Sequence, residues 1–153
     1  MRLLWQIYMN KRQLGNTNIN LNAIGFGGAP LGDLFENLEE PNCFQVLEKC
    51  YEANINLYDT SPLYGYGLSE HRLGNFLKTV DEDSYYLSTK VGRYLTPEQE
   101  SKIDRGRFAG GLNFSPHLDY SYDGVMRSFE QSLIRLAVSK VDICLIHDVD
   151  KFT

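Results

Sequence analysis

The stretch LYDTSPLYGYGLSEHRLG, residues 57–74, decides how the fold of this chain is interpreted. Its apolar start ends on Asp59, and Tyr64 follows five residues later in a loop rich in proline and glycine. A buried strand rarely needs an aspartate at its tip, and a turn does not need a tyrosine there. Functional side chains are often carried on loops held by a rigid scaffold, so the stretch predicts a strand end that faces a site.

Length and charge limit the classes of protein to which this chain can belong. The chain has 153 residues, 42% of them apolar, which is enough for one domain with a hydrophobic core. The net charge is −5 and the pI is about 5.2. An acidic balance argues against nucleic acid or an anionic membrane as partner.

The cysteines carry little functional information. There are three, Cys43, Cys50 and Cys144, and their odd number and wide spacing do not make a disulfide framework. Cys43 and Cys50 could share a helix face, but no further ligand follows at a metal-binding spacing. We expect small core residues and no metal site.

The first residues, MRLLWQIYMNKR, do not resemble a signal peptide. The apolar run is interrupted by Gln6 and followed by Asn10, with no small-residue cleavage site. No stretch approaches the roughly 20 apolar residues of a membrane span. We therefore expect a cytoplasmic protein with no membrane partner.

Strand and helix patterns alternate along the chain. Apolar periodicity predicts strands over 21–25, 55–59, 84–92 and 141–147, and helices over 39–54, 68–78 and 121–138. Ser69 is the expected N-cap of the second helix, and Ser121 or Asp123 that of the third. Residues 27–32 are expected to form a loop, and 93–120 a long functional or mobile loop. Such alternation predicts an α/β fold with parallel strands and crossover helices.

Chemically useful residues stand at the carboxyl ends of these strands, where parallel α/β folds place their sites. The first strand is followed by GFGGAP, the second ends on Asp59 before Tyr64, the third ends at Lys90 and the fourth at His147. Each has a structural alternative: a glycine turn, an Asx turn, an exposed aromatic, a solvated strand end or a hydrogen-bonded polar residue. Their convergence on one rim favours a site.

Two further polar residues, Glu70 and His71, fall in the first turn of the second predicted helix. An acidic side chain is favoured there by the helix dipole. A structural role is therefore expected for both.

Four stretches carry a resemblance to a known family: LGNTNINLNAIGFGGAPLG, NINLYDTSPLYGYGLSEHRLGNFL, YLSTKVGR and FEQSLIRLAVSKVDICLIHD. In this order and spacing the sequence resembles an aldo-keto reductase over nearly its whole length. SYDGVMRSFEQSL and IHDVD are similar to the bacterial group that acts on aldose sugars and related aldehydes. The chain departs from the family at Ala137, where such proteins usually turn with a glycine.

The resemblance implies an oxidoreductase that transfers hydride between nicotinamide and an aldehyde or aldose carbonyl. Tyr64 matches the general acid/base, Lys90 the ammonium that favours its phenolate form, Asp59 the partner of Lys90, and His147 the donor that orients the carbonyl. The positions expected to bind the cofactor, NADP or NAD, are Gly28, Ala29 and Asp59.

The expected architecture is the N-terminal half of a (β/α)8 TIM barrel, since about four strands are legible and a complete barrel has eight in about 250 residues. Residues 1–153 are expected to form a single, incomplete domain that lacks the C-terminal half of the barrel. An open barrel edge would favour self-association. Two alternatives stay open: a truncated, inactive fragment, and a non-catalytic half-barrel partner or regulatory subunit.

Overall fold

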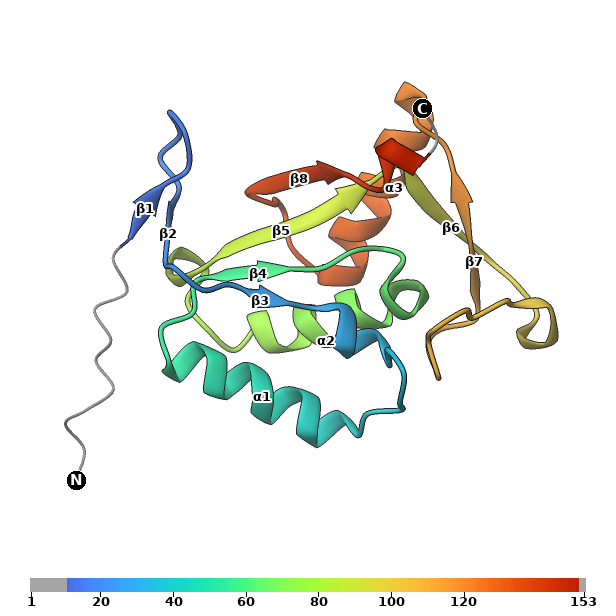
Figure 1. Ribbon diagram of the computed structural model, residues 1–153, viewed down its shortest axis with the longest axis horizontal. Helices are drawn as coiled ribbons and strands as arrows, with labels where there is room; N and C mark the ends of the chain where they lie inside the picture. Colours follow the sequence, from blue (N-terminus) through green and yellow to red (C-terminus); the bar gives the residue numbers. More distant parts are fainter. Residues whose placement is uncertain (1–10, 152–153) are drawn as a thin grey trace.

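The computed structural model describes residues 11–151, and this part of the chain is built around a parallel sheet of four strands in the order β3-β4-β5-β8 (Figure 1). The strands comprise Phe26–Gly27, Leu57–Asp59, Tyr86–Val91 and Ile143–Ile146. The predicted α/β class and the parallel direction of these strands are confirmed.

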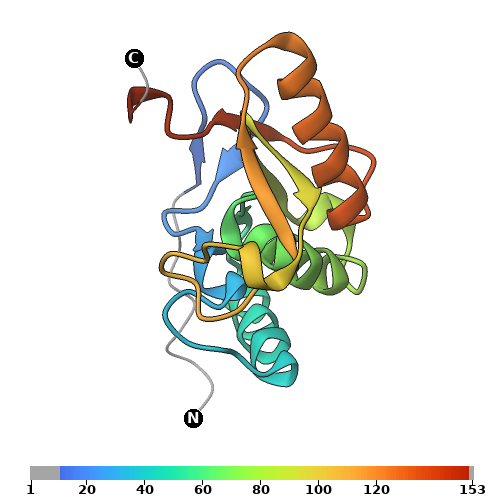
Figure 2. The same cartoon turned by 90° about the vertical axis from the view of Figure 1, so that its right-hand side faces the viewer.

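The main helices cover one face of this sheet (Figures 1 and 2). They are α1, Glu40–Glu52, α2, Leu68–Leu77, and α3, Tyr122–Leu136. The register places Phe26, Tyr58 and Leu87 side by side on the covered face. There Tyr58 and Leu87 pack with residues of all three helices in one core, whose buried members are Leu31, Cys43, Leu47, Tyr58, Leu73, Phe76, Leu77, Tyr85, Leu87 and Leu136.

Because side chains alternate along a strand, Leu57, Asp59, Ser88 and Lys90 lie on the opposite face from this core.

Five short 3-10 helices complete the described part of the chain: Ala29–Gly32, Tyr64–Gly67, Glu82–Ser84, Glu100–Lys102 and Val149–Lys151.

The first predicted strand is wrong in position. Residues 21–25 were expected in the parallel sheet, but Asn20–Leu21 forms β2, which pairs antiparallel with β1, Arg12–Gln13. The sheet strand β3 begins at Phe26 because that aromatic ring packs on Tyr58, 5.9 Å between centroids, and Gly27 pairs with Asp59. The alternating pattern belongs to the hairpin, which lies at the amino end of the sheet (Figure 1).

The predicted N-cap of α2 is also wrong, whereas that of α3 is confirmed. Helix α2 begins at Leu68 after Gly67, and Ser69 lies inside its first turn. The Ser69 hydroxyl instead donates to the Gly28 carbonyl at 2.7 Å and lies 2.8 Å from the Thr60 hydroxyl, which ties the loops after β3 and β4 together. For α3, the Ser121 hydroxyl accepts from the Gly124 amide at 3.2 Å.

The long segment expected as a loop contains a β-hairpin. Strands β6, Arg93–Pro97, and β7, Phe114–Leu118, pair antiparallel beyond the carboxyl end of the sheet (Figure 1). Backbone bonds at the two ends of the hairpin, from the Asp119 amide to the Gly92 carbonyl and from the Glu98 amide to the Asn113 carbonyl, make Leu95 and Pro116 a non-hydrogen-bonded pair. Pro116 is therefore tolerated, because no bond to β6 requires its missing N–H. The backbone N–H and C=O of Leu95 instead bond to the Gln131 side chain of α3, both at 2.9 Å.

Some expectations from the sequence concern regions outside the sheet. The signal-peptide question falls mainly on residues 1–10, which lie outside the described part. Among residues 11–151, no helix has the length and apolar character needed to cross a membrane. Cys43 is buried in the core and Cys50 packs against it, as predicted. The same prediction is wrong for Cys144, which is exposed on the edge strand β8.

Candidate active site

An ion pair at the carboxyl ends of β4 and β5 forms the centre of the candidate site. The Lys90 ammonium lies 2.6 Å from Asp59 Oδ2, and the two side chains are 12% and 28% exposed. Lys90 also donates to the Thr60 carbonyl at 2.9 Å, and Asp59 Oδ1 accepts from the Ser88 hydroxyl at 2.8 Å. Because these contacts hold both charged groups, the ammonium has a fixed position at the rim.

The loop that carries Tyr64 has an unusual backbone. Gly65, Tyr66 and Gly67 follow Tyr64 with φ values of 61°, 55° and 97°. Tyr66 keeps the left-handed conformation because it is buried and its hydroxyl donates to the Asp104 carbonyl at 2.8 Å. Gly32 packs so closely on the Tyr64 backbone that a Cβ there would collide with it. The loop is therefore shaped by packing on both sides of Tyr64.

Tyr64 itself lies between the other candidate residues. The Lys90 ammonium is 4.8 Å from the centroid of its ring. The His147 ring lies edge-on, with centroids 6.0 Å apart and an interplanar angle of 85°. The four residues selected at the strand ends, Asp59, Tyr64, Lys90 and His147, are thus brought together.

His147 extends the ladder between β5 and β8. Its backbone N–H donates to the Val91 carbonyl at 3.0 Å, and its own carbonyl accepts from the Tyr120 hydroxyl. The residue is only 9% exposed. Its Nε2 lies 3.8 Å from Oδ2 of Asp148, a carboxylate that also accepts from the Arg93 guanidinium at 3.1 Å. Backbone bonds therefore fix the point from which the imidazole projects.

The glycine loop after β3 lies beside Asp59. The Gly28 amide donates to the Asp59 carbonyl at 2.7 Å. A Cβ on Gly28 would approach that carbonyl at 2.7 Å and the Ser69 hydroxyl at 2.9 Å, so packing alone requires glycine there. Ala29 is partly buried at the start of the next 3-10 helix. At Gly27 a Cβ would meet nothing within 4 Å, so this backbone is accessible to a flat ring beside Asp59.

Two residues of the site were missed from the sequence. Ser88 binds Asp59, and the Ser61 hydroxyl lies 3.0 Å from His147 Nδ1. Ser88 could have been found, because it precedes Lys90 by two residues and so shares its face of β5. Ser61 had no such signal, since its partner is 86 residues away.

A buried ionic layer supports the site from the helix side. The Glu70 carboxylate accepts from Arg135 Nε at 2.6 Å and from the Thr89 hydroxyl at 2.8 Å. The Glu70 side chain is 0% exposed and that of Arg135 10%. Since Thr89 precedes Lys90, this layer fixes β5 against α2 and α3. A structural role was expected for Glu70 and is confirmed, but its partners are Arg135 and Thr89 rather than the helix end.

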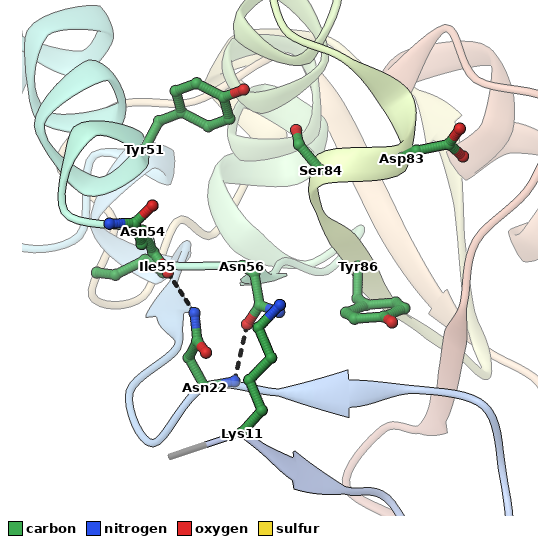
Figure 3. Close-up of a pocket in the computed structure, with 9 residues that line it drawn as sticks. All are labelled: Lys11, Asn22, Tyr51, Asn54, Ile55, Asn56, Asp83, Ser84 and Tyr86. Carbon is green, nitrogen blue, oxygen red and sulfur yellow. Dashed lines mark hydrogen bonds between the residues drawn. The ribbon is translucent and has the colours of Figure 1, made fainter. Parts of the chain in front are cut away.

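A polar cavity of about 450 Å³ lies at the opposite, amino end of the strands (Figure 3). There Asn22 bonds through its backbone to the Asn56 side chain, and through its side chain to the Asn54 carbonyl. These bonds join the β1–β2 hairpin to β4, and none of the predicted site residues lines the cavity. A structural role suits this end of the fold. No cluster suited to a metal ion occurs within residues 11–151.

Comparison with known proteins identifies the family to which this sheet and this group of residues belong. The model of the aldo/keto reductase family matches residues 23–153, and the chain belongs to that family. It is 39% identical to pyridoxal 4-dehydrogenase of Microbacterium luteolum over 94% of this chain and 44% of that protein. It is 38% identical to D-threo-aldose 1-dehydrogenase of a Pseudomonas species over 84% of this chain and 40% of that protein.

Solved structures give the same result. The holo form of an aldo-keto reductase from Bacillus halodurans superposes with a TM-score of 0.69 and 28% identity, covering 90% of this chain and 40% of that one. Such neighbours are (β/α)8 barrels, so the predicted fold class is confirmed. The chain spans less than half the length of these curated relatives.

Proposed function

We propose that this chain carries the catalytic residues of an NADP- or NAD-dependent oxidoreductase. The enzyme would reduce the carbonyl of an aldehyde or aldose to an alcohol, or oxidise such a substrate in the reverse sense. The observation that supports the proposal is the position of the Lys90 ammonium. It lies 2.6 Å from the Asp59 carboxylate and 4.8 Å from the centre of the Tyr64 ring, so one cation lies close to both the carboxylate and the aromatic ring. Membership of the aldo/keto reductase family supports the same reaction class.

In the direction of reduction, Tyr64 gives its phenolic proton to the carbonyl oxygen while the carbonyl carbon receives hydride. A nicotinamide held beside Asp59 would supply that hydride and would itself be oxidised. The nearby Lys90 ammonium stabilises the phenolate that remains, and Asp59 holds the ammonium in place. His147 donates a hydrogen bond that orients the carbonyl and stabilises negative charge on its oxygen. In oxidation of an alcohol, Tyr64 accepts the proton instead.

The residues after β3 fit the nicotinamide end of a dinucleotide. Gly27 offers exposed backbone beside Asp59, with nothing within 4 Å of a Cβ position. Asp59, with one carboxylate edge at the rim, can accept a ribose hydroxyl, and Gly28 and Ala29 continue the same loop. We propose that these residues hold the ribose and nicotinamide, and that strands which complete the barrel hold the rest. On this proposal residues 1–153 form one incomplete domain of a cytoplasmic protein.

The substrate class is proposed from the relatives. Two of them are named for oxidation of pyridoxal and of a threo-aldose, both small molecules with a carbonyl or hemiacetal centre. A small polar aldehyde, an aldose or its cyclic form would fit a rim with a phenol and an imidazole as donors.

A half-barrel that assembles with another chain, or with itself, is the second candidate. Apolar side chains are exposed at both edges of the parallel sheet. Ile24, which lies just before the edge strand β3, is 59% exposed. Leu145 and Ile146 of the other edge strand, β8, are 44% and 61% exposed. Unpaired edges with apolar side chains favour association. Sedimentation velocity distinguishes the cases, because a defined dimer supports assembly and a monomer at high concentration contradicts it.

The activity is tested with Tyr64→Phe. NADPH and NADH are titrated by nicotinamide fluorescence, and turnover of small aldehydes and oxidation of aldoses are followed by nicotinamide absorbance. We expect saturable binding in both proteins and turnover reduced at least a hundredfold in the variant, since general acid catalysis is worth about 10²–10⁴. Tyr122→Phe is the matched control, because Tyr122 is 78% exposed. Binding without Tyr64-dependent turnover refutes catalysis by this chain, and absence of binding favours the half-barrel partner.

A further inference from the structure

Ser61 is the buried hydrogen-bond partner of the candidate histidine. Its hydroxyl lies 3.0 Å from His147 Nδ1, and Ser61 is 0% exposed. The contact joins the loop after β4 to the end of β8. The backbone of His147 is already held by Val91 and Tyr120, so rotation of the ring is its main remaining freedom.

The direction of this hydrogen bond follows from the other partner of Ser61. The hydroxyl oxygen accepts from the Leu63 backbone N–H at 3.1 Å. A hydroxyl carries one hydrogen, and in the described part of the chain His147 Nδ1 is its remaining partner. If Nδ1 carried a proton, Ser61 would accept twice and its own hydrogen would be buried without an acceptor, which native proteins rarely tolerate. Ser61 therefore donates to Nδ1.

The far side of the ring agrees with this assignment. Oδ2 of Asp148 lies 3.8 Å from Nε2, and a carboxylate at that distance favours a proton on the nearer nitrogen. The same carboxylate is shared with Arg93. The carboxylate near Nε2 and the donor at Nδ1 both favour the same form of the neutral ring, in which the proton is on Nε2. At 3.8 Å the carboxylate is too distant to hold that hydrogen in a hydrogen bond, so Nε2–H stays able to donate to a substrate.

We propose that Ser61 is a positioning residue that holds His147 in the neutral Nε2–H tautomer, so that Nε2 presents its hydrogen to a substrate carbonyl. Donation of this hydrogen to a substrate carbonyl rests on the proposed function, whereas the assignment of the tautomer does not. The imidazole can then act as a donor without first binding a proton, and the tyrosine remains the source of the proton that is transferred.

The tautomer is measured in the folded chain by long-range ¹H–¹⁵N correlation after histidine labelling, with His147 assigned from the spectrum of His147→Gln. We expect an unprotonated, pyridine-like Nδ1 and a protonated, pyrrole-like Nε2 in the wild type. In Ser61→Ala both signals should move toward the values of a tautomer mixture. Ser84→Ala is the control, because its hydroxyl bonds to the Asp81 carbonyl far from the ring.

A pyrrole-like Nδ1 in the wild type, or unchanged His147 signals in Ser61→Ala, overturns the proposal. If Ser61→Ala does not fold, Ser61→Cys replaces it. The thiol is a weaker donor, so the signals should move part of the way, and their failure to move overturns the proposal equally. In a protein that turns over substrate, Ser61→Ala should lower kcat about tenfold with little change in KM, because a misoriented donor loses part of its electrostatic stabilisation. Absence of turnover in every protein would refute the proposed function and leave the tautomer result standing.

Discussion

Replacing Arg135 by methionine tests the buried ionic layer beneath the candidate site. The change keeps most of the apolar stem but removes the guanidinium, which lies 2.6 Å from the Glu70 carboxylate. Glu70 is 0% exposed, so water cannot take the place of the lost partner. Among residues 11–151, Thr89 would then be the one remaining hydrogen-bond partner of the carboxylate, at 2.8 Å.

The expected loss is large because it leaves a buried charge without compensation. Removing one partner of a buried ion pair typically costs about 3–5 kcal/mol in the free energy of unfolding. For a chain of this length that corresponds to a fall in Tm of roughly 6–20 °C. Urea titration followed by far-UV circular dichroism measures the difference directly.

Two further variants make the test specific. Lys49→Met removes a cation from an ion pair of equal length, 2.6 Å, whose side chains are 66% and 63% exposed, and it should change stability far less than Arg135→Met does, because water screens this pair. Adding Glu70→Gln to Arg135→Met should restore at least half of the loss, because a neutral amide replaces the unpaired carboxylate. If Arg135→Met is no more destabilising than Lys49→Met, the burial argument is refuted.

Two other stability predictions use the same titration. Tyr58→Phe should raise the free energy of unfolding by about 1 kcal/mol, since the Tyr58 hydroxyl is buried without a partner among the described residues. The same burial raises the pKa of Tyr58. Tyr66→Phe should lower the free energy of unfolding by a similar amount, because it loses the bond to the Asp104 carbonyl. A loss in Tyr58→Phe as large as that in Tyr66→Phe would contradict this reasoning. Ala137→Gly should stabilise by about 1 kcal/mol because Ala137 ends α3 with φ 54°, while Ala53→Gly, at the end of α1 with φ −80°, should bring no gain. Equal effects of the two glycines would show that left-handed strain at Ala137 is absent.

The sequence predicted the residues at the carboxyl ends of the strands better than the residues that hold them in place. Asp59, Lys90 and His147 could be selected because parallel strands end at one edge, so a polar residue after each apolar run is already placed. Tyr64 joined them because its loop leaves the same edge. These predictions needed only the strand pattern of each segment and the rule that parallel strands end at one edge.

Contacts between distant segments were not accessible in this way. Ser69 resembled a helix cap, but its hydroxyl binds the Gly28 carbonyl 41 residues away. Residues 93–120 resembled a loop because of their length and their several prolines and glycines. The strands within them depend on the pairing of β6 with β7 and on the contact of Leu95 with Gln131 of α3. The Ser61 and Arg135 contacts depend in the same way on β8 and α3 returning to the first half of the chain.

The register between β5 and β8 has a practical consequence. Cys144 pairs with Thr89 and so points to the side of the sheet on which the helices lie, yet it is exposed, as is its neighbour Ile146. Cys43 is buried, so a maleimide dye should label Cys144 in preference to it. The rate of labelling would report how accessible Cys144 is. It would fall when another chain or segment covers the helix-facing side of β8, and the measurement needs no change to the candidate site residues.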